Sequence, residues 1–406
     1  MKFKRNYFSL YFTFTLVFIY AIQDFLTSRN TTGEIALDRG LTHVSLFAII
    51  FFLATYFFYS TMISRRIMIS SINFILWSIA GWILFVNVFQ GTISWSMAIQ
   101  LGLSALWIFT YHLFSSYLRR FPQSWTLILV GITIMFGLYS FSVFYASYTI
   151  GDLYDSIAVI NLVYSVLVFL PWITLVPSKT MRRLFFLLAL IVVLISMKRG
   201  AFLVFPVMLL TSIFVEAVVC RRIYGPMIRV MFLFVLFFAG ILVADQLSDG
   251  YLSSRFLLEE ISSGSGRMIL YGTVIESLSQ ASLWSLFLGH GSGAVEELLG
   301  VAAHNEWLEF IYNYGIVGVF FYAALFFTLG HRLVKLIRQS SRFASGYAMA
   351  IVYLFVVGLF GQIYFTHSTF YIMAFLGAVE GLMIKDAQDS RVRSVNCNQR
   401  YKQGME

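Results

Sequence analysis

Long stretches that are apolar on every face recur along most of the chain, separated by short polar turns. A helix needs about 20 apolar residues to cross the hydrocarbon core of a bilayer, and these stretches run to roughly 17–25. Strands of a membrane barrel alternate apolar and polar residues, which these stretches do not. The pattern therefore predicts an all-α, polytopic membrane helix bundle. Twelve spans are expected, at residues 7–26, 41–62, 67–88, 93–115, 124–146, 157–176, 184–197, 201–220, 227–245, 305–329, 345–365 and 369–384.

One polar segment, residues 245–304, is far longer than any other connection. Loops of this length inside a compact protein are usually functional. Within it, residues 267–286 show the apolar spacing of an amphipathic helix that lies on a membrane surface. The apolar positions of this helix are Ile269, Val274, Leu278 and Leu283. The predicted organisation is nine membrane helices, one large external loop, three membrane helices and a polar tail, over 1–244, 245–304, 305–384 and 385–406.

Composition supports a membrane protein and excludes a soluble domain. Of the 406 residues, 59% are hydrophobic and 12% are charged, and the mean hydropathy is +0.82. Soluble domains carry about 25% charged residues. The lipid bilayer is therefore the expected partner of most of the surface.

The basic residues set the expected orientation. If the N-terminus is cytoplasmic, all but six of the 28 Lys and Arg residues fall on the cytoplasmic side, as the positive-inside rule requires. Both termini are then cytoplasmic, and the net charge of +9 indicates membrane topology instead of nucleic-acid binding. The six external basic residues are Arg29, Arg39, Lys198, Arg199, Arg255 and Arg267.

Two of these arginines stand beside glycine turns and are candidates for binding an anion. Lys198 and Arg199 occupy the tip of a tight helical hairpin, and Arg267 follows a Gly-Ser turn, where it can open a helix. A guanidinium group donates two parallel hydrogen bonds to phosphate. The alternative for these residues and for Arg255 is that the side chains reach lipid headgroups or pair with Glu259 or Glu260.

Histidines near the ends of the loop are candidates for proton transfer. His304 and Asn305 lie where the chain enters the tenth predicted span, and Glu309 is on the same helical face as Asn305. His290 lies in a glycine-rich run, residues 289–293, whose amides are a candidate cradle for phosphate. The alternative for His304 is a membrane-interface histidine bonded to a loop carbonyl, and the alternative for His290 is a simple exposed loop histidine.

No histidines, cysteines or carboxylates show the spacing of a metal site, so no metal and no cofactor are expected. The two cysteines, Cys220 and Cys397, are far apart and are expected to be unpaired thiols.

Three elements in order resemble one family: Lys198-Arg199-Gly200-Ala201 between helices, Gly266-Arg267 with Tyr271 in the long loop, and residues 289–293 followed by His304-Asn305. Residues 305–310 and 314–318 continue the last element. This arrangement resembles the O-antigen polymerase and O-antigen ligase superfamily of the Wzy and WaaL types, over roughly residues 185–330. Lys198 departs from the pattern, because many members carry a small or polar residue there.

The resemblance implies a GT-C-like glycosyltransferase of polysaccharide or lipopolysaccharide biosynthesis in a bacterial inner membrane, with the long loop in the periplasm. It implies transfer of a glycan from undecaprenyl diphosphate to an acceptor hydroxyl, without metal. The catalytic residues that it implies are Arg199, Arg267 and His304. Expected substrate-binding residues are Lys198, His290, Asn305, Tyr271 and Arg255.

A polysaccharide polymerase is the preferred interpretation, acting on a lipid-linked repeat unit and working with a chain-length regulator and a flippase. A ligase that transfers glycan to lipid A-core is the alternative. A flippase or transporter is less favoured, because transporters usually place charged residues midway through their spans.

Overall fold

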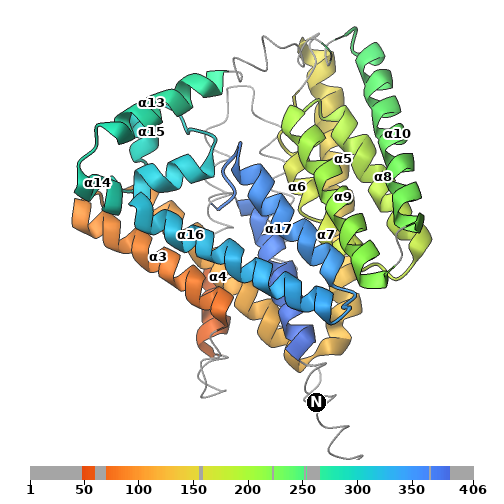
Figure 1. The fold of residues 1–406 in the computed structure, drawn as a ribbon, viewed down its shortest axis with the longest axis horizontal. Helices are drawn as coiled ribbons and strands as arrows, with labels where there is room; N and C mark the ends of the chain where they lie inside the picture. The colour runs from red at the N-terminus through yellow and green to blue at the C-terminus, as the bar shows by residue number, and fades with distance from the viewer. Residues whose placement is uncertain are drawn as a thin grey trace, which may run out of the picture.

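The computed structural model describes residues 48–59, 70–154, 159–221, 224–250, 253, 266–364 and 367–384. Every regular element in these ranges is a helix (Figure 1). In chain order the helices are Ala48–Tyr59, α3 (Ser71–Gln90), α4 (Trp95–Arg120), η1 (Pro122–Ser124), α5 (Trp125–Tyr154), α6 (Val163–Leu167), α7 (Leu170–Ile173), α8 (Lys179–Ile195), α9 (Arg199–Cys220), α10 (Tyr224–Leu247), α13 (Arg267–Ser279), α14 (Leu283–Leu288), α15 (Ala294–Leu299), α16 (Glu306–Arg338), α17 (Ala344–Gly358), η3 (His367–Thr369) and Phe370–Ile384.

Five of the described helices are long and apolar enough to cross a membrane. They are α3, α4, α9, α16 and the helical stretch Pro122–Tyr148, which contains most of α5. The other predicted spans from residue 48 onward also fall on helices, which are shorter than 18 residues or less uniformly apolar. The predicted span at 7–26 lies outside the described residues. The chain is therefore a helical, multi-pass membrane protein, and its twelve spans remain a prediction.

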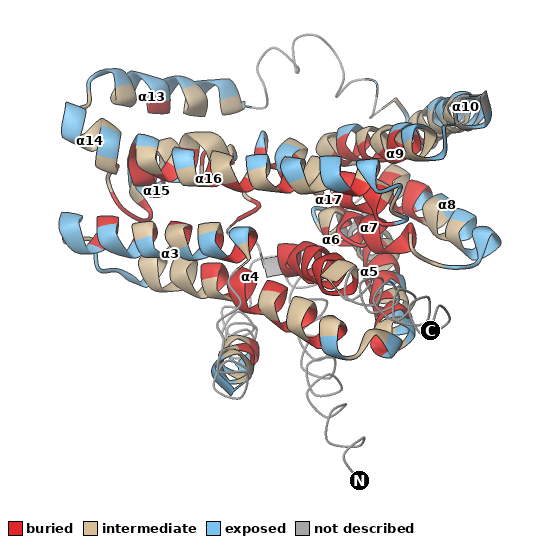
Figure 2. Cartoon of the chain, turned by 60° about the horizontal axis from the view of Figure 1, so that its bottom comes forward, coloured by how far each residue is buried: buried red, intermediate tan, exposed pale blue. Residues whose placement is uncertain are grey.

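The helix Phe370–Ile384 forms the centre of the bundle. All residues from Ser368 to Leu382 are buried, whereas α3, α8 and α10 expose one face (Figure 2). Gly377 and Gly381 face α4 so closely that added Cβ atoms would lie 2.4 and 2.5 Å from backbone oxygens of that helix. Small residues four apart let membrane helices approach closely, which explains how a helix can be buried on all sides here.

A buried ion pair ties this central helix to α16. Arg332 of α16 pairs with Glu380, whose side chain is only 7% exposed. An isolated charge within the bundle would be costly, so each partner requires the other. The pair fixes the rotation of α16 about its axis relative to Phe370–Ile384.

A sharp kink at Gly315 divides α16. Gly315 has φ +67°, and an added Cβ would lie 2.2 Å from the Phe287 carbonyl oxygen. The kink withdraws carbonyl groups from the helical hydrogen-bond ladder. The amides of His290 and Gly291 donate to the carbonyls of residues 312 and 313 at 3.0 and 2.8 Å. The Trp82 indole donates to the carbonyl of residue 314 at 2.8 Å. The kink therefore leaves none of these three backbone acceptors unsatisfied, as an apolar environment demands.

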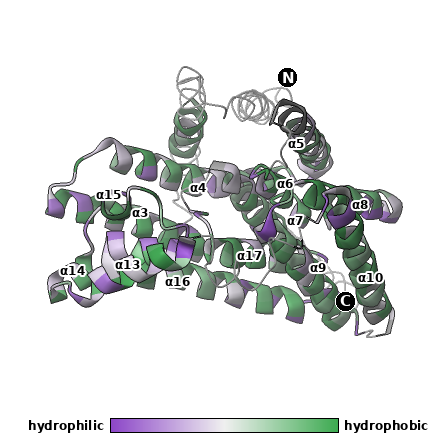
Figure 3. Ribbon diagram, turned by 90° about the horizontal axis from the view of Figure 1, so that it is seen from above, coloured by the Kyte–Doolittle hydropathy of each residue, from purple (hydrophilic) through white to green (hydrophobic). Residues whose placement is uncertain are grey.

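The predicted amphipathic helix over 267–286 is wrong in its extent, because two helices, α13 and α14, occupy this stretch. The Ser282 hydroxyl accepts the Ser285 amide and starts α14 anew. Val274 is fully buried, in a small cluster that Leu278 packs against, whereas Ile269 is 74% exposed. Hydrophilic residues are frequent on α13, while α9 and α10 are hydrophobic along most of their length (Figure 3).

We predict that Gly315→Ala lowers the free energy of unfolding by roughly 2–4 kcal/mol. The alanine backbone must adopt a positive φ, and its methyl group collides with the Phe287 carbonyl in the last turn of α14. Unfolding in detergent, followed by circular dichroism, measures the loss. Gly330→Ala is the control in the same helix, because an added Cβ there meets nothing within 4 Å. Alanine is favoured over glycine in helices, so the control should be neutral or stabilising. Equal stability of the two variants would contradict the account of the kink.

Candidate functional site

The turn between α8 and α9 presents Lys198 and Arg199. Only residues 196–198 separate the two helices, and Met197 adopts φ +48°. Lys198 is the N-cap residue of α9 in extended conformation, and Arg199 is the first helical residue. Both side chains are half-buried. The tight hairpin predicted from the sequence is confirmed, and it places two cations at one helix end.

Arg267 is the first residue of α13, as its position after the glycine turn predicts. Gly266 is the N-cap residue with φ +82°, and the Arg267 side chain is half-buried. Its guanidinium charge lies close enough to act on the hydroxyls of Tyr164 and Tyr271 and on the imidazole of His304. In the described part of the chain, Arg267 forms no ion pair with a carboxylate.

The turn before α16 holds His304 in a defined position. His304 has φ +56°, a conformation that is uncommon for a non-glycine residue. Its backbone amide donates to Glu309 Oε1 at 3.1 Å, and its carbonyl accepts the Tyr271 hydroxyl at 3.2 Å. The Asn305 side chain accepts the amide of residue 308 at 3.1 Å and caps α16. The backbone is thus held from both sides, while the residue keeps part of its surface open to solvent.

These three turns converge. The charges of both Arg267 and Lys198 act on His304, and the Asn305 side chain lies close enough to the Tyr271 hydroxyl to act on it. Lys198, Arg267, Tyr271, His304 and Asn305 are therefore brought together from three separate parts of the sequence. Arg199 is adjacent to this group through the backbone, because Lys198 precedes it and Gly200 follows it. Arg255 lies outside the described residues.

The electrostatics of the site keep His304 neutral. Partial burial, then the positive charges of Arg267 and Lys198, lower its pKa below the ordinary value of histidine. A neutral imidazole near pH 7 can accept a proton. The pKa of Tyr271 is raised by burial, which the Arg267 charge partly opposes, so its hydroxyl stays protonated and remains a donor.

Two buried carboxylates support the His304 turn, and their partners were not identified from the sequence. Glu309 is 3% exposed and accepts the Gln362 side-chain amide in addition to the His304 amide. Glu306 is fully buried and accepts the Tyr322 hydroxyl at 2.9 Å and the backbone amides of residues 363 and 364. Carboxylates at a helix N-terminus are stabilised by the helix dipole. The segment after α17 is thereby tied to the start of α16.

That segment also reaches the Lys198 turn. The Phe360 ring lies 3.0 Å from where a Cβ on Gly200 would be. Residues 359–364 therefore contact both the cationic turn and the carboxylates that hold His304, and the end of α17 lies between α13 and α6 in Figure 1. The sequence does not predict that residues 359–364 contact both turns, because these residues form the end of an apolar stretch.

The glycine-rich run 289–293 has a different role. The amides of His290 and Gly291 bond to α16, and the Ser292 amide donates to Asn87 Oδ1 at 2.9 Å. These three amides are thus occupied by protein acceptors and do not form a cradle for phosphate. The His290 ring stacks on Tyr312 at 4.6 Å, and burial lowers its pKa without help from a neighbouring charge. Among the described residues, the His290 ring contacts Tyr312, and no interaction joins it to His304.

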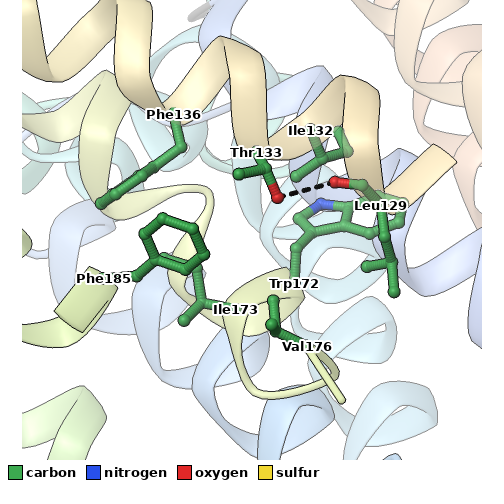
Figure 4. Close-up of a pocket in the computed structure, with 8 residues that line it drawn as sticks. All are labelled: Leu129, Ile132, Thr133, Phe136, Trp172, Ile173, Val176 and Phe185. Carbon is green, nitrogen blue, oxygen red and sulfur yellow. Dashed lines mark hydrogen bonds between the residues drawn. The ribbon is translucent and has the colours of Figure 1, made fainter. Parts of the chain in front are cut away.

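An apolar crevice between α5, α7 and α8 is distinct from this group. Its lining residues are Leu129, Ile132, Thr133, Phe136, Trp172, Ile173, Val176 and Phe185. The one hydroxyl in it, on Thr133, is satisfied by the carbonyl of residue 129 (Figure 4). The crevice carries no charged side chain and is therefore unsuited to an anionic ligand. Among the described residues, no group of three or more His, Cys, Asp or Glu side chains is placed to hold a metal ion.

Comparison with models of protein families finds no match, and no curated protein matches the sequence.

We predict that Lys198→Met raises the pKa of His304, because the lysine charge opposes protonation of the imidazole. The rate at which diethyl pyrocarbonate modifies the His304 peptide, followed against pH by mass spectrometry, reports the neutral fraction. The midpoint should move to higher pH in the variant. Lys179→Met, at the opposite end of α8, is the matched control and should leave the midpoint unchanged. An unchanged midpoint in Lys198→Met would show that the two side chains do not interact.

Proposed function

We propose that the chain is a membrane glycosyltransferase that polymerises a polysaccharide, taking glycan from undecaprenyl diphosphate and adding it to a sugar hydroxyl of a lipid-linked repeat unit. The observation that carries the proposal is the convergence of Lys198 and Arg267 on a neutral His304. The order of the Arg-Gly, Gly-Arg and His-Asn elements supports the same family of reactions.

In the proposed reaction, the acceptor hydroxyl oxygen forms a bond to the anomeric carbon of the donor glycan. The bond from that carbon to the diphosphate oxygen breaks, and the electron pair leaves with undecaprenyl diphosphate. His304 accepts the proton of the hydroxyl. Arg267, Lys198 and Arg199 stabilise the negative charge that develops on the departing diphosphate. Tyr271 and Asn305 keep the His304 turn in place through their contacts with it and with each other.

The membrane arrangement that we propose has twelve spans with both termini cytoplasmic, which puts the segment 245–304 in the periplasm of a bacterial inner membrane. The distribution of basic residues supports this orientation. The site is then at the outer surface, where lipid-linked repeats delivered by a flippase are accessible. A chain-length regulator is a further expected partner. His290 and Arg255 remain candidate contacts for the glycan.

We predict that Arg199→Ala, Arg267→Ala and His304→Ala each reduce polymerisation by roughly 10²-fold or more, since each removes a group that acts on developing charge or on the proton. Glycan ladders from cells that lack the native gene and express each variant measure this loss. Arg183→Ala is the control, because Arg183 is exposed and lies about 18 Å or more along α8 from the site.

The glycan phenotype of the deletion itself separates the two transfer reactions. A polymerase deletion leaves a single repeat on lipid A-core, whereas a ligase deletion leaves none. Long-chain ladders of normal intensity in all three variants, with the proteins present at normal levels, would refute the proposed function.

A further inference from the structure

Tyr164, in α6, lies against Gly200 at the start of α9 and close enough to Arg267 for that charge to act on it. A Cβ added to Gly200 would lie 2.0 Å from the Tyr164 hydroxyl oxygen, so the hydroxyl keeps its place only because residue 200 has no side chain. The Arg267 charge acts on the same hydroxyl. Tyr164 therefore stands between two of the elements that the sequence pattern singled out, although the pattern does not include it.

Among the described residues, no acceptor is found for the Tyr164 hydroxyl or the Arg267 guanidinium group. Within the described ranges, the Tyr164 hydroxyl has no hydrogen-bond partner and Arg267 has no carboxylate partner. The guanidinium group has five donors and no acceptor, and a protonated phenol beside it supplies one more donor. Buried or half-buried polar groups are normally hydrogen-bonded. A ligand rich in acceptor oxygens and negative charge would satisfy both side chains at once.

We propose that the Tyr164 hydroxyl donates a hydrogen bond to an oxygen of the donor's diphosphate, alongside Arg267. This inference rests on the proposed function and adds to it a substrate contact that comes from an apolar segment. The phenol does not change charge during the reaction. It shares its proton with a phosphate oxygen that becomes more negative as the glycosyl bond breaks, so the contact strengthens toward the transition state.

The test measures binding of undecaprenyl diphosphate to the purified full chain in detergent. A hydrogen bond to a charged group is worth enough that Tyr164→Phe should raise Kd roughly tenfold or more. Tyr353→Phe is the matched control: its hydroxyl donates to the Tyr164 carbonyl at 3.1 Å, but Tyr353 is 1% exposed and does not reach a ligand. Its Kd should stay at the wild-type value, although loss of this buried hydrogen bond lowers its unfolding midpoint. The unfolding midpoint of Tyr164→Phe should match wild type.

Two other anions identify the source of the phosphate. Inorganic diphosphate should compete for the site and show the same dependence on Tyr164, whereas phosphatidylglycerol should bind wild type and Tyr164→Phe equally. A Tyr164 effect confined to phosphatidylglycerol would overturn the proposal in favour of a lipid-headgroup contact.

Gly200→Ala distinguishes donation from packing. The new methyl must displace the Tyr164 hydroxyl, and it also crowds the Phe360 ring. If the hydroxyl donates to the ligand, the double variant Gly200→Ala/Tyr164→Phe binds as weakly as Tyr164→Phe alone. If the hydroxyl only packs, removing it relieves the collision, and the double variant binds more tightly than Gly200→Ala, close to wild type.

The outcomes also separate this inference from the proposed function. Weak binding in Arg267→Ala together with unchanged binding in Tyr164→Phe would overturn the role of Tyr164 alone. Equal, weak binding of undecaprenyl diphosphate to wild type and Arg267→Ala would show that Arg267 does not bind the diphosphate. That result would refute both the proposed function and the role of Tyr164.

Discussion

The buried carboxylates of Glu306 and Glu309 are the constraint on which the site depends. Among the described residues, each accepts hydrogen bonds from groups outside its own helical turn: Glu309 from His304 and Gln362, Glu306 from Tyr322 and the amides of residues 363 and 364. A buried carboxylate without such donors would be costly, so neither the His304 turn nor the segment 359–364 can separate from the start of α16 without a large loss of free energy. This linkage holds His304 in an uncommon backbone conformation at the edge of the bundle.

The rule that backbone groups must be satisfied in an apolar environment explains the glycine-rich run. The kink at Gly315 opens the helical ladder, and residues 290 and 291 close it again with their own amides. The run therefore anchors the short helices α14 and α15 to α16, while α13 carries Arg267 to the His304 turn. The same residues that resemble a phosphate cradle in the sequence act in the structure as part of the scaffold.

The chemistry of the site follows from an excess of donors and positive charge. The charges of Lys198 and Arg267 act on one imidazole, the Arg267 charge also acts on the hydroxyls of Tyr164 and Tyr271, and no carboxylate among the described residues pairs with Arg267. Such a site favours a ligand that brings both negative charge and acceptor oxygens, as a diphosphate does. The Lys198 charge acts on His304, so it contributes to favouring the neutral imidazole.

The sequence by itself determined the helical membrane class, because a membrane span depends on local apolar content. It also placed the Lys198, Arg267 and His304 turns at helix ends, because the glycines and Asn305 act on the backbone of their immediate neighbours. Only the tertiary structure decided that these turns meet. It also decided that α13 and α14 are separate and that the backbone amides of residues 290–292 bond to the scaffold. Tyr164, Phe360 and Gln362 lie in apolar segments without a polar pattern, and their roles come from packing between residues far apart in the chain.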